Sequence, residues 1–223
     1  SGTRARKTIT IKDFYEFASK KFQTGNPAKE IITPKIEKRK PKFLTKQEVQ
    51  KLLDATKTKN EPFRSRDRLI ILLFATVGLR VGELVKIKLT DLNSGFLRVT
   101  GKRNKERVIK LNKDIIKAWD EYLKVRPNVS EYLFLNKDGN PITVRGVQYI
   151  IEQYLQQANL DRKGYSVHTL RHTAATLILK GTRNMRLVQN ILGHEHISTT
   201  QIYAHVDEEM LNEAAIATEG LFT

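Results

Sequence analysis

The most hydrophobic run of the chain, residues 66–77, restricts its fold more than any other feature. The run reads RDRLIILLFATV, is apolar on nearly every side of a helix, and is followed by Gly78, a residue type that often ends helices. It falls short of the ~18–20 residues that a membrane-spanning helix needs. We therefore predict a short helix that other elements bury inside a globular core.

The composition indicates a globular protein with an anionic partner. Of the 223 residues, 39% are hydrophobic, which is enough for the core of one domain and a smaller appendage. Lys and Arg outnumber Asp and Glu by 40 to 24, and the formal net charge is +16. This excess favours a polyanion, with nucleic acid ahead of an anionic membrane surface. The sequence has no cysteine, which excludes disulfides and thiolate chemistry.

The chain divides into two parts around a basic segment. Residues 8–22 have apolar side chains at helical spacing, and GNP at 25–27 ends that helix. Residues 33–42, TPKIEKRKPK, carry two prolines and five basic residues, which is typical of an extended linker. Thr45 and Glu48 then have the spacing of a capping box, so we expect a new domain to open there.

The second part contains both helices and a β-hairpin. Residues 96–100 and 107–111 read as two strands around a strongly basic turn. Helices are expected at 112–125, at 144–158, between Gly181 and Gly193, and at 207–217, with Leu123 and Val144 among the core side chains. The last helix packs either on its own domain or on a neighbouring protomer. The predicted fold class is α+β, mostly helical, with a small antiparallel hairpin or sheet.

All five histidines lie between Ser166 and His205, in less than a fifth of the chain. On a helix of ~100° per residue, His168, Arg171 and His172 share one side. The segment continues as an apolar run, which places this polar cluster at the N-terminus of a buried helix. Its cationic groups need an acceptor, and the free N–H groups of a helix N-terminus also attract an anion. The predicted ligand is a phosphate.

Arg80 and Glu83 follow directly after the most hydrophobic run. One interpretation is an ordinary ion pair at a helix junction. The other is a guanidinium that Glu83 holds rigid and aims into a site, a role that suits arginine because its planar fork matches phosphate oxygens.

The residues present favour phosphate chemistry without a metal. The sequence has neither a P-loop nor the clustered carboxylates of a two-metal nuclease. His168 and His172 have the spacing of a zinc pair, but the glutamate of HExxH is missing and Arg171 would repel a cation. A side-chain nucleophile is then needed, and Tyr203 lies in the same stretch as His194. Arginines can stabilise a pentacovalent phosphate, and a lysine can protonate the departing oxygen.

Several of these residues also fit plainer roles when each is taken singly. His172, His196 and His205 fit satisfied structural residues, Tyr203 fits a packed side chain, and Lys102 fits a solvated turn. The combination of arginine, lysine, His-x-x-Arg, histidine and tyrosine is what carries the argument.

Four motifs follow one another along the chain: ATVGLRVGEL at 75–84, GKRNKER at 101–107, HTLRH at 168–172 and LGHEHISTTQIYAHV at 192–206. Taken together, they resemble those of the tyrosine recombinases, the phage integrase family, and come closest to its Xer-like and transposon-integrase members. The resembling region spans roughly 43–206. The resemblance implies the fold of a tyrosine recombinase catalytic domain.

The resemblance also implies a role for each motif residue. Arg80 and Arg171 would hold the scissile phosphate, and Tyr203 would attack it to form a 3′-phosphotyrosyl link. Lys102 would be the general acid toward the 5′-oxygen leaving group, with His168 assisting proton transfer.

The remaining positions have supporting roles in this resemblance. His194 would bond a non-bridging oxygen, and Glu83 and His172 match positions that support the catalytic groups. The family commonly has GKGxK in the hairpin, whereas Arg103 replaces the second glycine here. Whether Lys102 or Lys105 reaches the DNA is therefore left open.

The resemblance implies a domain plan and partners as well. Residues 1–32 would be the last helix of an N-terminal core-binding domain, 33–42 the linker, and 43–223 the catalytic domain with its C-terminal helix. The partners would be a double-stranded DNA recombination site and three further copies in a tetramer that exchanges the helix at about 207–217, with accessory proteins as further candidates. No metal, ATP or other cofactor, and no membrane, would be needed. The expected location is cytoplasmic, at the prokaryotic nucleoid during activity.

Three other functions compete with strand cleavage and rejoining. A metal-dependent nuclease would use the histidines and lose activity in a chelator. A DNA-binding module without chemistry would bind DNA in a salt-dependent way and never become covalently attached. A type IB topoisomerase would use related chemistry but would relax DNA rather than resolve junctions.

Overall fold

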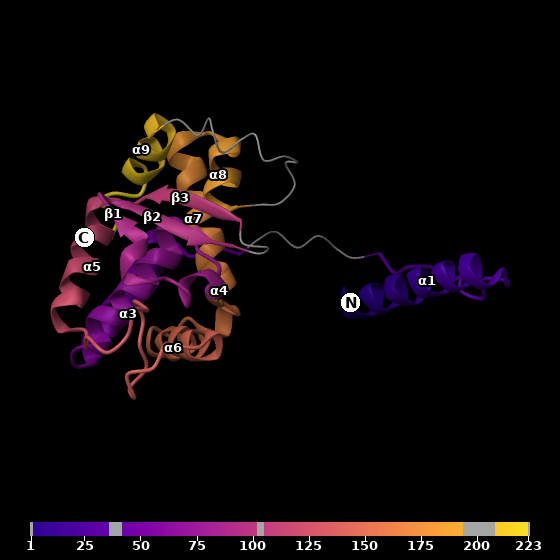
Figure 1. Ribbon diagram of the computed structural model, residues 1–223, viewed down its shortest axis with the longest axis horizontal. Coiled ribbons are helices and arrows are strands. Elements are labelled where there is room, and N and C mark those ends of the chain that lie inside the picture. Colours follow the sequence, from indigo (N-terminus) through magenta and orange to yellow (C-terminus); the bar gives the residue numbers. More distant parts are fainter. Residues whose placement is uncertain (1, 36–41, 102–104, 194–207, 223) are drawn as a thin grey trace. The chain divides into compact units, whose positions relative to one another are not determined.

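The computed structural model describes residues 2–35, 42–101, 105–193 and 208–222, and the chain forms two compact units, 1–40 and 41–223. The first unit is the helix α1 (Gly2–Phe22) and the short segment after it (Figure 1). Ala5 and Ala28 are its buried residues, and Lys12 donates to the carbonyl of Ile31 at 3.0 Å. The helix predicted at 8–22 is confirmed and begins six residues earlier.

The second unit is mostly helical, as predicted, with one small sheet (Figure 1). Its first half contains α2 (Lys46–Ala55), the 3-10 turn η1 (Thr56–Thr58), α3 (Phe63–Leu72), the π-helical turn η2 (Leu73–Val77), α4 (Val81–Leu84), the 3-10 turn η3 (Leu89–Asp91), β1 (Leu92–Asn93), β2 (Phe96–Thr100) and β3 (Glu106–Lys110). Its second half contains α5 (Lys113–Val125), α6 (Val144–Gln157), the 3-10 turn η5 (Asp161–Lys163), α7 (Val167–Thr182), α8 (Met185–Leu192) and α9 (Glu208–Ile216).

The helix α2 begins where the sequence predicted it. The Thr45 side chain accepts from the N–H of Glu48 at 3.2 Å, and a Glu48 carboxylate oxygen accepts from the N–H of Thr45 at 2.7 Å. Both bonds of the capping box are therefore made, which satisfies two N–H groups that a helix start leaves without partners.

The sheet is antiparallel with the strand order β1-β2-β3. Val99 pairs with Arg107 and Leu97 with Ile109, and all four side chains are buried on one face. The second predicted strand starts one residue earlier than expected, and β1 was not predicted, because two residues are too few to show an alternating pattern.

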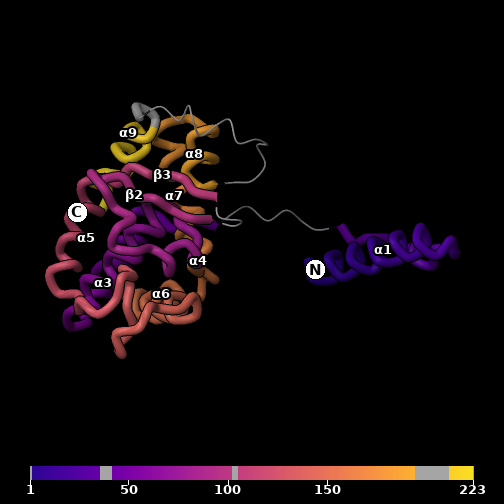
Figure 2. The backbone as a smooth tube through the Cα atoms, in the orientation of Figure 1, coloured from indigo at the N-terminus to yellow at the C-terminus, as the bar shows by residue number. Residues whose placement is uncertain are grey.

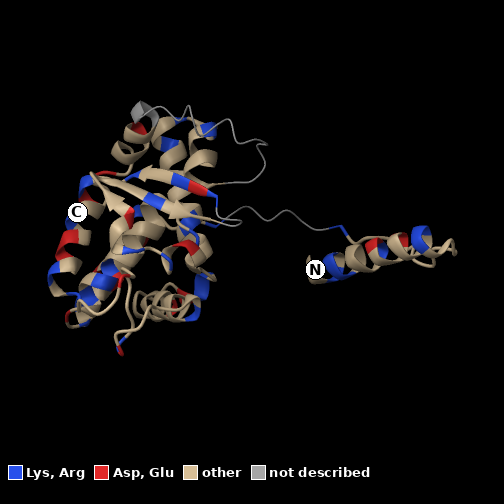
Figure 3. Ribbon diagram, viewed as in Figure 1, with Lys and Arg blue, Asp and Glu red and all other residues tan. Residues whose placement is uncertain are grey.

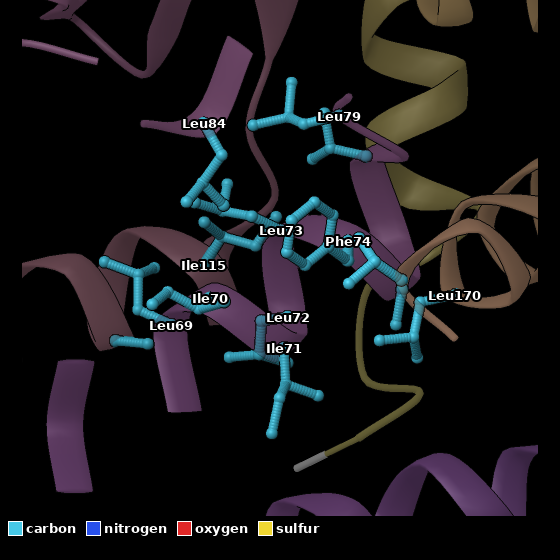
Figure 4. Close-up of a cluster of buried hydrophobic side chains, with 14 of the residues drawn as sticks. Leu69, Ile70, Ile71, Leu72, Leu73, Phe74, Leu79, Leu84, Ile115 and Leu170 are labelled. Atoms are coloured by element: carbon cyan, nitrogen blue, oxygen red, sulfur yellow. The ribbon is translucent and has the colours of Figure 1, made fainter. Parts of the chain in front are cut away.

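The hydrophobic run at 66–77 lies at the centre of the core, as predicted. Every side chain from Leu69 to Phe74 is at most 2% exposed, and Figure 4 shows Leu84, Ile115 and Leu170 from other elements around this run. The helix α7 packs along η2, although about 100 residues separate them in sequence (Figure 2). This packing brings Arg171 of α7 next to Gly78, which ends the central helix formed by α3 and η2.

Gly78 ends the central helix and sets the direction of the chain into the site. It has φ of 70°, and its N–H donates to the carbonyl of Leu73 at 3.0 Å. A Cβ on this glycine would lie 2.6 Å from a methyl carbon of Leu192 and 3.1 Å from Cβ of Ala174. Only glycine therefore combines this left-handed backbone with such close packing of α7 and α8.

The C-terminal helix α9 packs on its own domain, against α7, α8 and β3. A Cβ on Gly181 would lie 2.6 Å from Cβ of Ala217, so the chain that follows α9 approaches α7 closely. Asn112 donates to the Thr218 hydroxyl at 3.1 Å, and Phe222 is 2% exposed. Of the two placements that the sequence left open for this helix, the structure has the one on its own domain.

Two expected core positions are wrong. Leu123 is 41% exposed and Val144 is 38% exposed, although both have the spacing of a buried helical face. Leu123 lies near the end of α5, and Val144 is the first residue of α6, where neighbouring elements no longer cover the helix. None of the helices that the structure describes has the length and apolar character required to cross a bilayer.

Candidate active site

Three arginines from three different elements meet at the C-terminal end of α8. Arg107 of β3 donates through Nε to the carbonyl of Ile191 at 2.8 Å. The next two carbonyls, those of Leu192 and Gly193, accept from Nη2 of Arg171 and Nη2 of Arg80, each at 2.6 Å. The last carbonyls of a helix lack partners within the helix and carry its partial negative charge, so cationic donors are favoured there.

Arg80 is held by Glu83 at the start of α4, as the sequence predicted. Its Nη1 lies 2.9 Å from one Glu83 carboxylate oxygen, and its backbone N–H donates to the other at 2.8 Å. The Arg80 side chain is 37% exposed, while the Glu83 side chain is 4% exposed. The buried carboxylate thus fixes both the backbone and the guanidinium of Arg80, and the guanidinium keeps contact with solvent.

Arg107 was not among the site residues predicted from the sequence, and it makes a bidentate bond to Glu83. Its Nη1 and Nη2 donate to the two carboxylate oxygens of Glu83 at 2.8 and 2.9 Å, and the residue is only 6% exposed. The alternation of β3 could have identified Arg107 as buried, because Arg107 points to the same face of the strand as Ile109. An arginine on the inward face of a strand requires a buried acceptor.

Arg171 lies on α7 and bonds the chain at the ends of η2 and α8, each of which is followed by a glycine. Besides its bond to the carbonyl of Leu192, it donates through Nη1 to the carbonyl of Gly78. Burial, and then the positive charge of Arg80, lower the pKa of Arg171 to about 10. Arg171 is therefore still cationic at neutral pH, but it lies in a region where another cation is unfavourable and an anion is stabilising.

The site has more positive than negative charge. Burial by itself would raise the pKa of Glu83, but the hydrogen bonds and charge of Arg107, followed by the bonds from Arg80, bring it below its ordinary value. Glu83 is thus ionised at neutral pH and accepts from two guanidiniums, those of Arg80 and Arg107, while Arg171 adds a third positive charge to the described part of the site. Figure 3 shows Lys and Arg distributed over both units of the chain.

His168 and His172 lie on the first two turns of α7, on the same helix as Arg171. Both are exposed, whereas Arg171 is half-buried. The predicted helix N-terminus is present, with Ser166 in the N-cap position. Within the described ranges, no group of three or more His, Cys, Asp or Glu side chains is arranged to hold a metal ion.

Lys102, His194 and Tyr203 lie outside the described residues, as does Arg103. The residues that precede two of them are described, and both border the arginine cluster. A Cβ on Gly101 would lie 3.6 Å from a carboxylate oxygen of Glu83, and Gly101 donates to the carbonyl of Lys105 at 2.7 Å.

Gly193 borders the same cluster from the other side. A Cβ there would lie 3.2 Å from Nη1 of Arg107 and 3.4 Å from Nη1 of Arg80, and the residue has φ of 63°. Because Gly193 has no side chain, the two guanidiniums can pack directly against its backbone. The residues that lead into 102–104 and 194–207 are thus Gly101, beside Glu83, and Gly193, beside two arginines that bond Glu83.

The sequence matches a known family over most of its length. The profile of the phage integrase family matches residues 42–210, which include the whole arginine cluster. The chain belongs to the phage integrase family.

Its curated relatives are tyrosine recombinases. Tyrosine recombinase XerC of Caldanaerobacter subterraneus subsp. tengcongensis is 46% identical over 218 residues, which cover 95% of this chain and 61% of that protein. Tyrosine recombinase XerD of Staphylococcus haemolyticus is 40% identical over 219 residues, which cover 94% of this chain and 73% of that protein. The chain thus spans about three fifths of the first relative and about three quarters of the second.

Solved structures of recombinases share the fold. The XerA recombinase superposes with a TM-score of 0.63 at 25% identity, covering 95% of this chain and 82% of that one. The XerH site-specific recombinase in a post-cleavage complex with a palindromic difH substrate gives 0.67 at 27% identity, covering 90% and 63%. A lambda integrase tetramer bound to a Holliday junction gives 0.69 at 21% identity, covering 87% and 60%, and supports the fold alone.

Proposed function

We propose that this chain is the catalytic part of a site-specific DNA recombinase that cleaves and rejoins strands through a 3′-phosphotyrosyl intermediate. The pair of Arg80 and Arg171 is the observation that carries this proposal. Their Nη2 atoms bond the carbonyls of adjacent residues, and the charge of Arg80 contributes to the lowered pKa of Arg171. Two guanidiniums this close are unfavourable without an anion, and phosphate oxygens match their planar donors.

The proposed reaction balances without a metal or ATP. The Tyr203 hydroxyl attacks the scissile phosphorus and releases its proton to solvent, the bond from phosphorus to the 5′-oxygen breaks, and Lys102 donates a proton to that oxygen. Arg80 and Arg171 stabilise the extra negative charge on the pentacovalent phosphate. One phosphodiester bond is exchanged for one phosphotyrosyl bond, so a 5′-hydroxyl can reverse the step on a new strand.

The other motif residues have supporting roles in this proposal. His194 bonds a non-bridging oxygen, His168 assists proton transfer on the leaving-group side, and Glu83 orients Arg80. His172 lies one turn after His168 and supports that side of the site. Gly101 borders Glu83 and Gly193 borders Arg80, which supports roles for the residues that follow them, Lys102 among them.

The proposed partner is double-stranded DNA at a recombination site. A net charge of +16 supports it, because Lys and Arg contacts to phosphates release counterions and dominate affinity for DNA. Related recombinases are known in DNA-bound complexes and as a DNA-bound tetramer, and we extend both to this chain. Assembly of the tetramer would move α9 from its own domain to a neighbouring copy, and accessory proteins and the prokaryotic nucleoid complete the proposed setting.

The test is capture of the covalent intermediate in EDTA. A binding selection from randomised duplexes first supplies the DNA site, and a set of duplexes with a nick stepped through that site then serves as suicide substrates. We expect a protein–DNA adduct on a denaturing gel, and a nucleotide-modified Tyr203 peptide in the mass spectrum after nuclease digestion.

The control is a matched pair of tyrosine variants. Tyr203→Phe should abolish the adduct, whereas Tyr149→Phe, at a side chain that is 62% exposed on α6, should leave it unchanged. An adduct that survives in Tyr203→Phe would contradict the nucleophile. Strand cleavage that requires added metal would favour the nuclease, and salt-dependent binding with no adduct from any nicked duplex would favour a binding module.

A further inference from the structure

Arg107 is the one member of the arginine cluster that is buried, and its guanidinium joins three elements. It makes two bonds to Glu83 of α4 and one to the carbonyl of Ile191 at the end of α8, while its own backbone belongs to β3. All three bonds are 2.8 to 2.9 Å long and come from one planar group. A planar fork with fixed donors sets the relative positions of its acceptors, which a flexible ammonium group does not.

We propose that Arg107 is a positioning residue for strand transfer, which acts through Glu83 and α8 on the two arginines that bind phosphate. This inference rests on the function proposed above. It assigns Arg107 no contact with DNA, because the residue is only 6% exposed and the described bonds direct its fork at Glu83 and its Nε at Ile191.

The first route of this action passes through Glu83. Both carboxylate oxygens of Glu83 accept from Arg107, and the same two oxygens accept from the guanidinium and the backbone N–H of Arg80. Arg107 is the leading cause that keeps the Glu83 carboxylate ionised against the effect of burial. Without Arg107, Glu83 would fix the position of Arg80 less firmly and would be less fully ionised beside it.

The second route passes through the C-terminal turn of α8. The carbonyls of three consecutive residues, 191 to 193, accept from Arg107, Arg171 and Arg80 in that order. A phosphate that engages Arg80 and Arg171 competes with their carbonyl acceptors for the same Nη2 donors. Arg107 has no such competitor, so its bond keeps the end of α8 in place when the other two arginines turn to the DNA.

The third consequence concerns the hairpin. Arg107 pairs with Val99 across β2 and β3, and two residues before it Lys105 accepts from Gly101. The bidentate bond therefore ties the base of the turn that carries Lys102 to the carboxylate that orients Arg80. The hairpin turn on the leaving-group side and Arg80 on the phosphate side are thereby both positioned by the bond between Arg107 and Glu83.

The experiment separates positioning from stability and from DNA contact. The rate of adduct formation is measured in single turnover with saturating protein, and the dissociation constant is measured on uncut duplex, for wild type, Arg107→Met and Arg107→Lys. We expect Arg107→Met to slow adduct formation about 10- to 100-fold, the effect of losing a group that orients a catalytic one. The dissociation constant should stay within about threefold of wild type.

Arg107→Lys keeps a cation within reach of one carboxylate oxygen but loses the fork. We expect its rate to lie between those of wild type and Arg107→Met. The lysine variant also carries the test if Arg107→Met fails to fold, because it leaves Glu83 with a counter-charge. The double variant Arg107→Met/Glu83→Gln should be no slower than the slower of its two single variants, since both changes interrupt the same route.

Arg66→Met is the matched control. Arg66 is another buried arginine, 7% exposed and paired with a buried carboxylate, Asp67, but it lies on α3 outside the cluster. If Arg66→Met slows adduct formation by folded protein as much as Arg107→Met does, general destabilisation explains both and the positioning role is wrong.

The remaining outcomes distinguish the two proposals. If wild type forms no adduct, the function proposed above fails and this inference fails with it. If wild type forms the adduct and Arg107→Met is equally fast, only the positioning role fails. If the rate of Arg107→Met falls only as far as its affinity for DNA, Arg107 binds the DNA and the positioning role also fails.

Discussion

Two buried ion-pair clusters in this chain use the same chemical groups but differ in charge balance, since one is neutral and the other has surplus positive charge. On α3, Arg66 donates to Asp67 at 2.8 Å, the Tyr154 hydroxyl donates to the other oxygen of Asp67 at 2.8 Å, and Arg66 also bonds the carbonyl of Leu135 at 2.7 Å. One cation meets one anion there, and both are buried. At the end of α8, the guanidiniums of Arg80 and Arg107 share Glu83, and Arg171 adds a third positive charge nearby. Arg80 and Arg171 are half-buried.

The difference teaches how to recognise an anion site among buried charges. The cluster at Asp67 satisfies its own charge, and burial, followed by the charge and hydrogen bond of Asp67, raises the pKa of Tyr154 far above its usual range. The Tyr154 hydroxyl therefore stays protonated as a donor to Asp67, and the cluster needs no ligand. The cluster at Glu83 retains surplus positive charge, and some of it reaches the surface. That surplus, more than burial or ion pairing as such, supports the phosphate site proposed above.

The largest expected effect comes from removing the carboxylate of each cluster. Glu83→Gln and Asp67→Asn should each lower the free energy of unfolding by about 3–5 kcal/mol at pH 7, because a buried guanidinium loses its counter-charge. Urea titration measures both. The rate of adduct formation distinguishes the two clusters, since only Glu83→Gln should slow it in protein that is still folded.

The pH dependence of the same variant has a defined sign. The pKa of Glu83 is lower in the folded protein than its ordinary value of 4.5, so its contribution to stability is complete above about pH 4.5 and is lost as the pH falls through the folded pKa. The difference in stability between wild type and Glu83→Gln should therefore shrink below pH 4.5. A difference that grows on acidification would contradict the assignment of charge.

The next effect concerns the surplus cations. Arg171→Lys should reduce the rate of adduct formation by about 10²- to 10³-fold, because a lysine cannot donate to two carbonyls and a phosphate in one plane. Single-turnover kinetics at saturating protein measure it. Arg64→Lys, in an exposed pair with Glu61, is the control and should react at the wild-type rate. Equal rates for Arg171→Lys and wild type would contradict the view that the surplus positive charge at Glu83 distinguishes it from the cluster at Asp67.

The smallest effect concerns the backbone that brings the cluster together. Gly78→Ala should lower the free energy of unfolding by about 2–3 kcal/mol, because the left-handed conformation and the close contact with Leu192 both penalise a Cβ. Gly82→Ala on α4 is the control, since its Cβ would meet nothing within 4 Å, and it should stay within about 1 kcal/mol of wild type. Thermal or urea unfolding compares them.

The sequence alone determined the features that depend on neighbours within about five residues. The capping box at Thr45, the end of the central helix at Gly78 and the ion pair of Arg80 with Glu83 all join residues three to five apart. The mostly helical fold and the hairpin followed from periodicity, and the motif spacings were enough for the family. These signals are local because capping, turns and side-chain facing are set by the dihedral angles of a few residues.

Only the tertiary structure decided which distant groups meet. Arg107 reaches Glu83 across 24 positions, Arg171 reaches Gly78 across 93, and Arg80 reaches the carbonyl of Gly193 across 113. The exposure of Leu123 and Val144 depends likewise on what covers each end of a helix. Periodicity identifies the buried face of an element but not the groups opposite it, because that pairing is set by how whole elements pack.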